Sequence, residues 1–140
     1  NWGALLGWAA VTGGLGPAPL ALYVAGVAWT LGYDTVYALQ DKEDDALIGV
    51  RSTALLLGAR ARLGVAGFYA AALAMLALAG ALAGLGWPFY AVLLAASAQL
   101  GWQTATLDSD DAANCLHRFR SNKHFGWLVF AAIILGQVWP

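Results

Sequence analysis

The charged residues of this chain fall into two short windows, and the rest of the sequence carries no charge. All seven Lys and Arg and all eight Asp and Glu lie within residues 34–62 or 108–123. An apolar helix needs about 20 residues, at about 1.5 Å per residue, to cross a hydrocarbon core about 30 Å thick. The uncharged stretch 63–107 is long enough for two such crossings. This distribution predicts a membrane protein.

Composition supports the same conclusion. The chain is 61% hydrophobic and 11% charged, with a net charge of −1. A soluble domain has about 25% charged residues, so this chain has too little polar surface to coat a globule in water. A chain without basic excess also gives no reason to expect nucleic acid as a partner, since nucleic-acid binding needs a basic surface. Membrane lipid is the predicted surrounding.

The uncharged stretches divide at two glycine- and proline-containing turns, near residues 13–17 and 84–88. The predicted fold is therefore an all-α, polytopic transmembrane helical bundle whose two charged windows share one face. Lys and Arg mark the cytoplasmic side of a membrane, so we expect this face in the cytoplasm and the chain in a bacterial inner membrane. The predicted segments are a partial helix near 2–12 and crossings near 18–39, 64–83, 88–107 and 125–139.

The first window contains a run of acids that follows an apolar helix. If that helix continues to Gly49, a suitable C-terminal stop, Asp34, Asp41 and Asp45 lie within roughly 40° of one another at about 100° per residue. Tyr37 flanks them on the same side. A run of acids is most often a solvated loop, and this alternative stays open. Asp34 argues against it, because an ionisable residue at the mouth of an apolar helix is costly and indicates function.

The spacing of Asp41 and Asp45 indicates a cation site. At positions i and i+4 the two carboxylates repel each other unless a cation lies between them. Carboxylate oxygens suit Mg²⁺, which takes one or two carboxylates and completes its shell with water and substrate phosphate. Arg51, a few residues later, could meet phosphate oxygens directly.

The stretch YDTVYALQDKEDDALIGVRSTALLLG, residues 33–58, resembles the second aspartate-rich motif of the UbiA-type intramembrane prenyltransferases. Within that superfamily it is most similar to the branch that prenylates 4-hydroxybenzoate for ubiquinone synthesis. The resemblance implies an acidic site at the cytoplasmic mouth of a central cavity. It implies polyprenyl diphosphate and 4-hydroxybenzoate as substrates and Mg²⁺ as cofactor. The implied metal ligands are Asp41, Asp45 and Asp44, and the implied substrate-binding residues are Arg51, Tyr37, Asp34 and Lys42.

The chain departs from the family in one respect, since the superfamily's first acidic motif, on an earlier loop, is absent. Residues 1–140 therefore resemble the C-terminal part of a single prenyltransferase domain. The N-terminal half is the expected partner, and we expect this chain alone to be inactive. Two alternatives remain: a superfamily branch that prenylates a different ring, and a non-enzymatic membrane transport or assembly module. Uncharged span centres argue against a transporter, which places polar sites near the midplane.

The second window is less specific. The acids at 108–111 predict a helix N-cap with acids in its first turn. Cys115 has no neighbouring base at useful spacing and is expected to be structural. His117 and His124 lack metal-ligand partners at useful spacing. The polar residues of the fourth crossing, Gln99, Gln103 and Thr104, fit either interhelical hydrogen bonds or cavity contacts.

Overall fold

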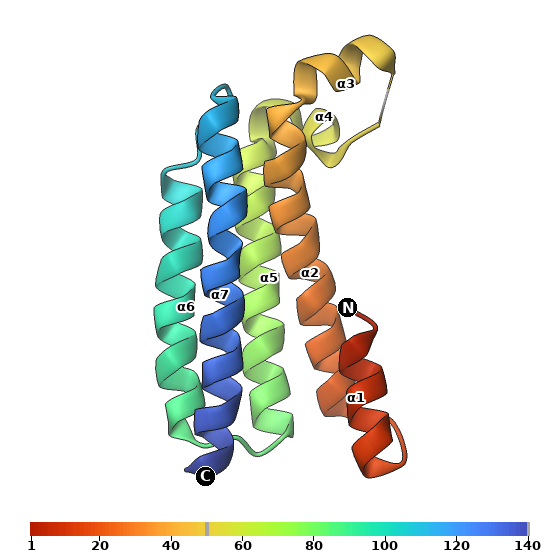
Figure 1. Ribbon diagram of the computed structural model, residues 1–140, viewed down its shortest axis with the longest axis vertical. Coiled ribbons are helices and arrows are strands. Elements are labelled where there is room, and N and C mark those ends of the chain that lie inside the picture. The colour runs from red at the N-terminus through yellow and green to blue at the C-terminus, as the bar shows by residue number, and fades with distance from the viewer. Residues whose placement is uncertain (50, 140) are drawn as a thin grey trace.

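Every regular element that the computed structural model describes is a helix, and four long helices run side by side (Figure 1). The structure describes residues 1–49 and 51–139, without the side chains of Glu43, Asp44 and Ala46. The long helices are α2 (Pro17–Gln40), α5 (Ala61–Leu82), α6 (Trp87–Ala105) and α7 (Ala112–Val138). The short ones are α1 (Gly3–Thr12), α3 (Lys42–Ile48), α4 (Thr53–Leu57) and a 3₁₀ turn, Gly58–Arg60.

Helices lie where the sequence predicts them, and both predicted turns are present. Gly13 ends α1 in the left-handed conformation, with φ of 77°, and Gly84 takes φ of 69° between α5 and α6. The last crossing was predicted near 125–139, after a helix N-cap at 108–111. The structure joins the two in one helix that begins at Ala112, with Asp111 as its N-cap, because the residues between them are good helix formers. Most of the second charged window is therefore helical.

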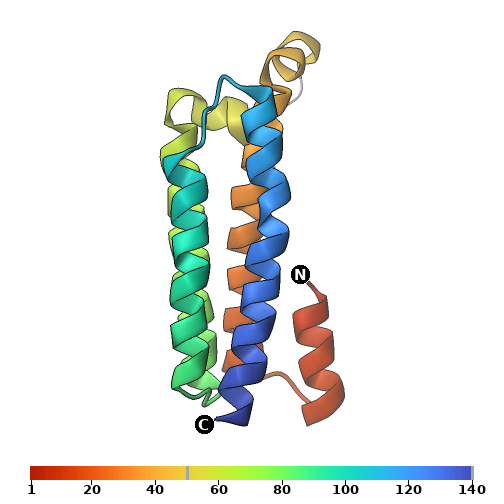
Figure 2. The ribbon, with the colours of Figure 1, turned by 60° about the vertical axis from the view of Figure 1, so that its left-hand side comes forward.

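Both charged windows begin at the same end of the bundle, as predicted. In Figures 1 and 2, α3, α4 and the loop between α6 and α7 lie at the upper end, and the two uncharged turns lie at the lower end. We refer to the upper end, residues 39–62 and 106–112, as the polar end.

One helical stretch among the described residues, Thr53–Leu82, is both long enough and apolar enough to cross a membrane by itself. Several crossings were predicted, and α2, α6 and α7 have the length but not the hydropathy. Their interiors carry Gln, Tyr and Trp, and the first half of α7 carries Lys, Arg and His. These side chains lower the mean hydropathy even where the helix is long.

Close helix packing depends on glycines that receive aromatic rings. A β-carbon added at Gly32 on α2 would collide with the ring of Tyr69 on α5, and one added at Gly80 on α5 would collide with the ring of Phe89 on α6. Tyr69 and Phe89 are both buried. Small residues let helix backbones approach closely. This matters in a membrane, because lipid is as apolar as the helices and no hydrophobic effect drives them together. This packing holds the four long helices in one bundle below the polar end.

Candidate functional site

The predicted acidic helix is broken at its first motif aspartate. Helix α2 ends at Gln40, and Asp41 (φ −111°, ψ 15°) separates it from α3. The predicted continuous helix to Gly49 is therefore wrong, although Gly49 does end α3 in the left-handed conformation. The break has an electrostatic reason. Acids at the C-terminal end of one long helix would face its negative dipole end, whereas after the break they occupy the first turn of a new helix.

The break still leaves Asp41 and Asp45 one helical turn apart. The backbone N–H of Asp45 donates to the carbonyl of Asp41 at 2.9 Å, so both carboxylates belong to one turn. The predicted ligand Asp44 has its side chain outside the described residues. Asp34 is exposed on α2, and no hydrogen bond or ion pair joins it to another described residue. The angular argument that grouped Asp34 with the other two does not hold across the break.

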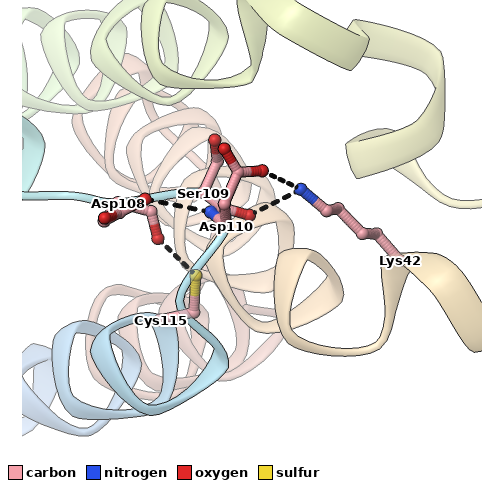
Figure 3. Close-up of polar contacts among 5 residues, drawn as sticks. All are labelled: Lys42, Asp108, Ser109, Asp110 and Cys115. Carbon is pink, nitrogen blue, oxygen red and sulfur yellow. Dashed lines mark hydrogen bonds and ion pairs between the residues drawn. The ribbon is translucent and has the colours of Figure 1, made fainter.

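Lys42 joins the acidic motif to the loop between α6 and α7 (Figure 3). Its Nζ donates to the carbonyl of Ser109 at 2.9 Å and forms an ion pair with Asp110. The same loop is held by Asp108, whose Oδ1 accepts the Asp110 N–H at 3.0 Å. Segments 67 residues apart are therefore tied together at the polar end. This contact had no signal in the sequence, because the second window carries mixed charges without a motif.

A cavity of about 200 Å³ lies under this contact. Its lining includes Gln40, Asp41 and Lys42 from the motif and Ser109 and Asp110 from the loop. The amide Oε1 of Gln40 is buried without a partner among the described residues. The cavity thus combines the carboxylates of Asp41 and Asp110 with the Lys42 ammonium group, which is a set suited to a metal cation bound together with an anion.

Arg51 does not share this cavity. It lines a separate, shallow cavity of about 370 Å³ with residues of α4. Helix α4 is held by a Ser52 N-cap and by a 2.9 Å hydrogen bond between the hydroxyls of Thr35 and Thr53. Arg51 is therefore close to the acidic motif in sequence, but it lies on a different surface of the polar end.

Tyr37 lies in an aromatic row between α2 and α7. Its ring is half exposed, with its centroid 5.0 Å from that of Phe119, and Tyr33 lies 5.9 Å from the same ring. Farther from the polar end, between the same two helices, the ring centroids of Trp29 and Phe125 lie 5.0 Å apart. The row leads from the acidic motif to an apolar cavity of about 420 Å³ that is lined by Trp29, Phe125 and small residues of α1 and α2.

The second charged window supplies the N-cap of α7. Asp111 is the N-cap, and its carboxylate accepts the Asn114 N–H at 3.1 Å. The acids therefore precede the first turn of α7, and the predicted acidic first turn is wrong.

Arg62 fulfils a role that the sequence did not signal, because its guanidinium donates to the carbonyls of Thr104 and Ala105 at the C-terminus of α6. Cations at that end offset the helix dipole.

The structure decides the open question about the polar residues of α6. Gln103 accepts from the Tyr69 hydroxyl at 2.9 Å and from the Asn122 amide at 3.3 Å. Gln99 donates to the carbonyl and hydroxyl of Ser121. These are interhelical hydrogen bonds, whereas the Thr104 hydroxyl bonds only within its helix, to Leu100. Asn122, the centre of this network, has no sequence signal of its own.

The donor set at Asp41 fits Mg²⁺ bound jointly with phosphate. No group of three or more His, Cys, Asp or Glu that could hold a metal occurs among the residues whose side chains the structure describes. Mg²⁺ does not need such a cage, since one or two carboxylates together with water and phosphate oxygens are its usual shell. Asp41 and Asp45 supply hard oxygen donors of that kind.

Comparison with known proteins settles the family. A family model described as "UbiA prenyltransferase family" matches residues 1–137. The chain belongs to the UbiA prenyltransferase family. This family is membrane-embedded.

The similar curated relatives agree with the resemblance in the acidic motif. The chain is 54% identical to "4-hydroxybenzoate polyprenyltransferase, mitochondrial" of Arabidopsis thaliana over 98% of its length, and 51% identical to the Mus musculus protein of the same name over 99%. It is 40% identical to "4-hydroxybenzoate geranyltransferase 1" of Lithospermum erythrorhizon over its whole length. It covers 34%, 37% and 46% of these relatives, respectively. No solved structure gives a significant match.

The relatives bear on location as well. Names that specify mitochondria give no support to the predicted bacterial inner membrane. What the family supports is the coarser statement that the protein is embedded in a membrane.

Proposed function

We propose that this chain forms the diphosphate-binding part of a prenyltransferase that moves a polyprenyl chain from polyprenyl diphosphate to 4-hydroxybenzoate in ubiquinone synthesis. The observation that carries the proposal is the cavity at the polar end, where Asp41 and Lys42 of the acidic motif meet the loop that holds Ser109 and Asp110. The names of the similar relatives support the acceptor, because the polyprenyl and geranyl enzymes share 4-hydroxybenzoate.

The reaction is a substitution at an allylic carbon. The bond between that carbon and the diphosphate oxygen breaks, with its electron pair going to the diphosphate. A ring carbon of 4-hydroxybenzoate then donates an electron pair to the allylic carbon and loses its proton to solvent. Bound Mg²⁺ would neutralise charge on the departing diphosphate. The products are diphosphate, a proton and the prenylated ring.

The residues of the chain have separate roles in this reaction. Asp41, Asp45 and Asp44 would hold Mg²⁺, which would carry the diphosphate. Lys42 would donate to phosphate oxygens in exchange for its Ser109 and Asp110 partners. Arg51 would meet a more distant phosphate oxygen. Asp34 would contribute to substrate binding, and the exposed ring of Tyr37 would offer a π face to the allylic cation.

The apolar part of the donor would follow the aromatic row into the bundle. The 420 Å³ cavity beside Trp29 and Phe125 supports this path, since its lining is apolar apart from Asn1. We place the polar end on the cytoplasmic or matrix side of the membrane, because every Lys and Arg lies there or on the adjoining half of α7.

The test is a transfer assay in membranes that contain the protein together with the remainder of the family domain. Asp41→Asn and Asp45→Asn should each lower kcat/KM at least about 100-fold, because a lost anionic ligand removes stabilisation of developing charge. Asp111→Asn is the matched control, since it removes the same charge from the neighbouring loop while Asn caps a helix as well as Asp. Chelation should abolish transfer and added Mg²⁺ should restore it.

Equal losses in the control and the motif variants would contradict the proposed role of the motif. The membranes could instead form no prenylated 4-hydroxybenzoate and attach the polyprenyl chain to another ring. That result would favour the alternative of a superfamily branch that prenylates a different ring. A transport or assembly module would yield no prenylated product from any ring.

A further inference from the structure

A groove between α6 and α7 lies outside the residues assigned to prenyl transfer. It encloses about 410 Å³ and is lined by Gln99 and Trp102 on α6 and by Arg120, Lys123 and His124 on α7, among others. None of its lining residues is acidic. The two permanently charged groups, Arg120 and Lys123, are exposed and form no ion pair with any carboxylate that the structure describes.

Neighbouring contacts keep the groove in shape. The Arg118 guanidinium lies 4.2 Å from the centroid of the Trp102 ring and bonds Nδ1 of His117 at 2.8 Å. Because a guanidinium only donates, Nδ1 of His117 is the acceptor in this bond. Gln99 is fixed by its two hydrogen bonds to Ser121. These contacts tie α6 to α7 beside the groove.

The position of the groove along the bundle matches a lipid headgroup. The Gln99–Ser121 contact lies six residues before the end of α6 at Ala105, or roughly 9 Å from the polar end. Long Lys and Arg side chains reach the interface from such a depth. Basic pockets between membrane helices on the cytoplasmic or matrix side are suited to anionic headgroups.

The surface below the groove is apolar and continues along the same face of α7. Trp127, Phe130 and Ile134 follow His124 at spacings of three and four residues, and each is about half exposed or more. This spacing keeps them on one helical face. A basic pocket above an apolar strip has the layout of a phospholipid, with a phosphate at one end and acyl chains at the other.

We propose that this groove binds the phosphate of an anionic glycerophospholipid. Arg120 and Lys123 contact the phosphate, His117 and His124 lie beside it, and the acyl chains lie against the Trp127 strip. The site is independent of the proposed prenyl transfer, because it shares no residue with the acidic motif.

Native mass spectrometry of the detergent-purified protein tests the proposal, with added phosphatidylglycerol or phosphatidylcholine of identical acyl chains. We expect phosphatidylglycerol to bind at least tenfold more tightly. Arg120→Gln and Lys123→Gln should each weaken its binding about fivefold, and the double variant about 25-fold, as expected for the loss of one or two cations at an anionic headgroup. Arg60→Gln removes an equally exposed cation elsewhere at the polar end and should leave binding unchanged.

Three outcomes would overturn the proposal: equal binding of the two lipids, unchanged phosphatidylglycerol binding in the double variant, or displacement of the lipid by millimolar glycerol phosphate. The second would show that phosphatidylglycerol binds outside the groove, and the third would indicate a free phosphate as the occupant. Far-UV circular dichroism verifies that the exposed substitutions leave the helices intact, so a loss of binding is attributable to the groove.

Discussion

The indole Nε1 of Trp29 on α2 donates a 2.9 Å hydrogen bond to Oδ1 of Asn122 on α7, across 93 residues of sequence. An indole N–H can only donate, so this bond fixes the orientation of the Asn122 amide and turns its Nδ2 toward Oε1 of Gln103. Gln103 in turn accepts from the Tyr69 hydroxyl. One buried polar chain therefore joins all four long helices just beneath the polar end.

Asn122→Leu should destabilise the bundle by roughly 1–3 kcal/mol, because it leaves the Trp29 donor buried without a partner and removes an interhelical bond. Reversible unfolding in mixed micelles measures this. Thr104→Val is the control, since its hydroxyl bonds only within α6, and it should cost less than half as much. Comparable losses would show that the network has no special role.

Gly80→Ala should destabilise the protein by roughly 1–3 kcal/mol, because its β-carbon meets the ring of Phe89 in a packed interface. Gly67→Ala lies in the same helix, where an added β-carbon meets nothing within 4 Å. It should be neutral or stabilise by up to about 1 kcal/mol through helix propensity. Unfolding midpoints that shift in the same direction for both variants would contradict the packing described for α5 and α6.

Cys115 should react slowly with thiol reagents. The side chain is fully buried and donates to the Asp108 carbonyl at 3.2 Å. Burial raises the pKa of the Cys115 thiol, Asp111 raises it further and Lys42 opposes them. We expect alkylation at pH 8 to be at least about tenfold slower in the folded than in the unfolded protein. Iodoacetamide kinetics measure this, and equal rates would contradict the burial.

The raised pKa of the Cys115 thiol predicts the direction in which stability changes with pH. A thiol whose pKa is higher in the folded state contributes stability that is complete below the unfolded pKa. The contribution is lost as the pH rises through the folded pKa. The free energy of unfolding should therefore fall more steeply above about pH 8.5 in the wild type than in Cys115→Ser, which cannot titrate there.

The topology predicts opposite labelling of the two ends of the bundle. In a Cys115→Ser background, single cysteines at Gly14 and Trp87 should react with an impermeant reagent on intact bacterial cells that express the protein. Cysteines at the polar-end positions Leu47 and Asp110 should react only after the cells are opened. All four positions are exposed, so burial does not account for a difference. The reverse pattern would overturn the orientation inferred from Lys and Arg.

Sequence alone determined where the long helices lie, the two uncharged turns between them and the common end of the charged windows. These follow from local physical chemistry: uncharged runs of crossing length, glycines that allow a left-handed turn at Gly13 and Gly49, and a chain that reverses at each turn. The acidic motif also led to the family, because its residues are contiguous in the chain.

Only the tertiary structure decided how the polar end is assembled. The break at Asp41 depends on dipoles of two helices rather than on the propensity of one. The Lys42 contact with Ser109 and Asp110, the Arg62 cap on α6 and the Asn122 network each join segments that lie far apart in sequence. Such contacts depend on which side chains face each other after the helices pack. The residue pattern of a single helix does not show which other segment it will contact.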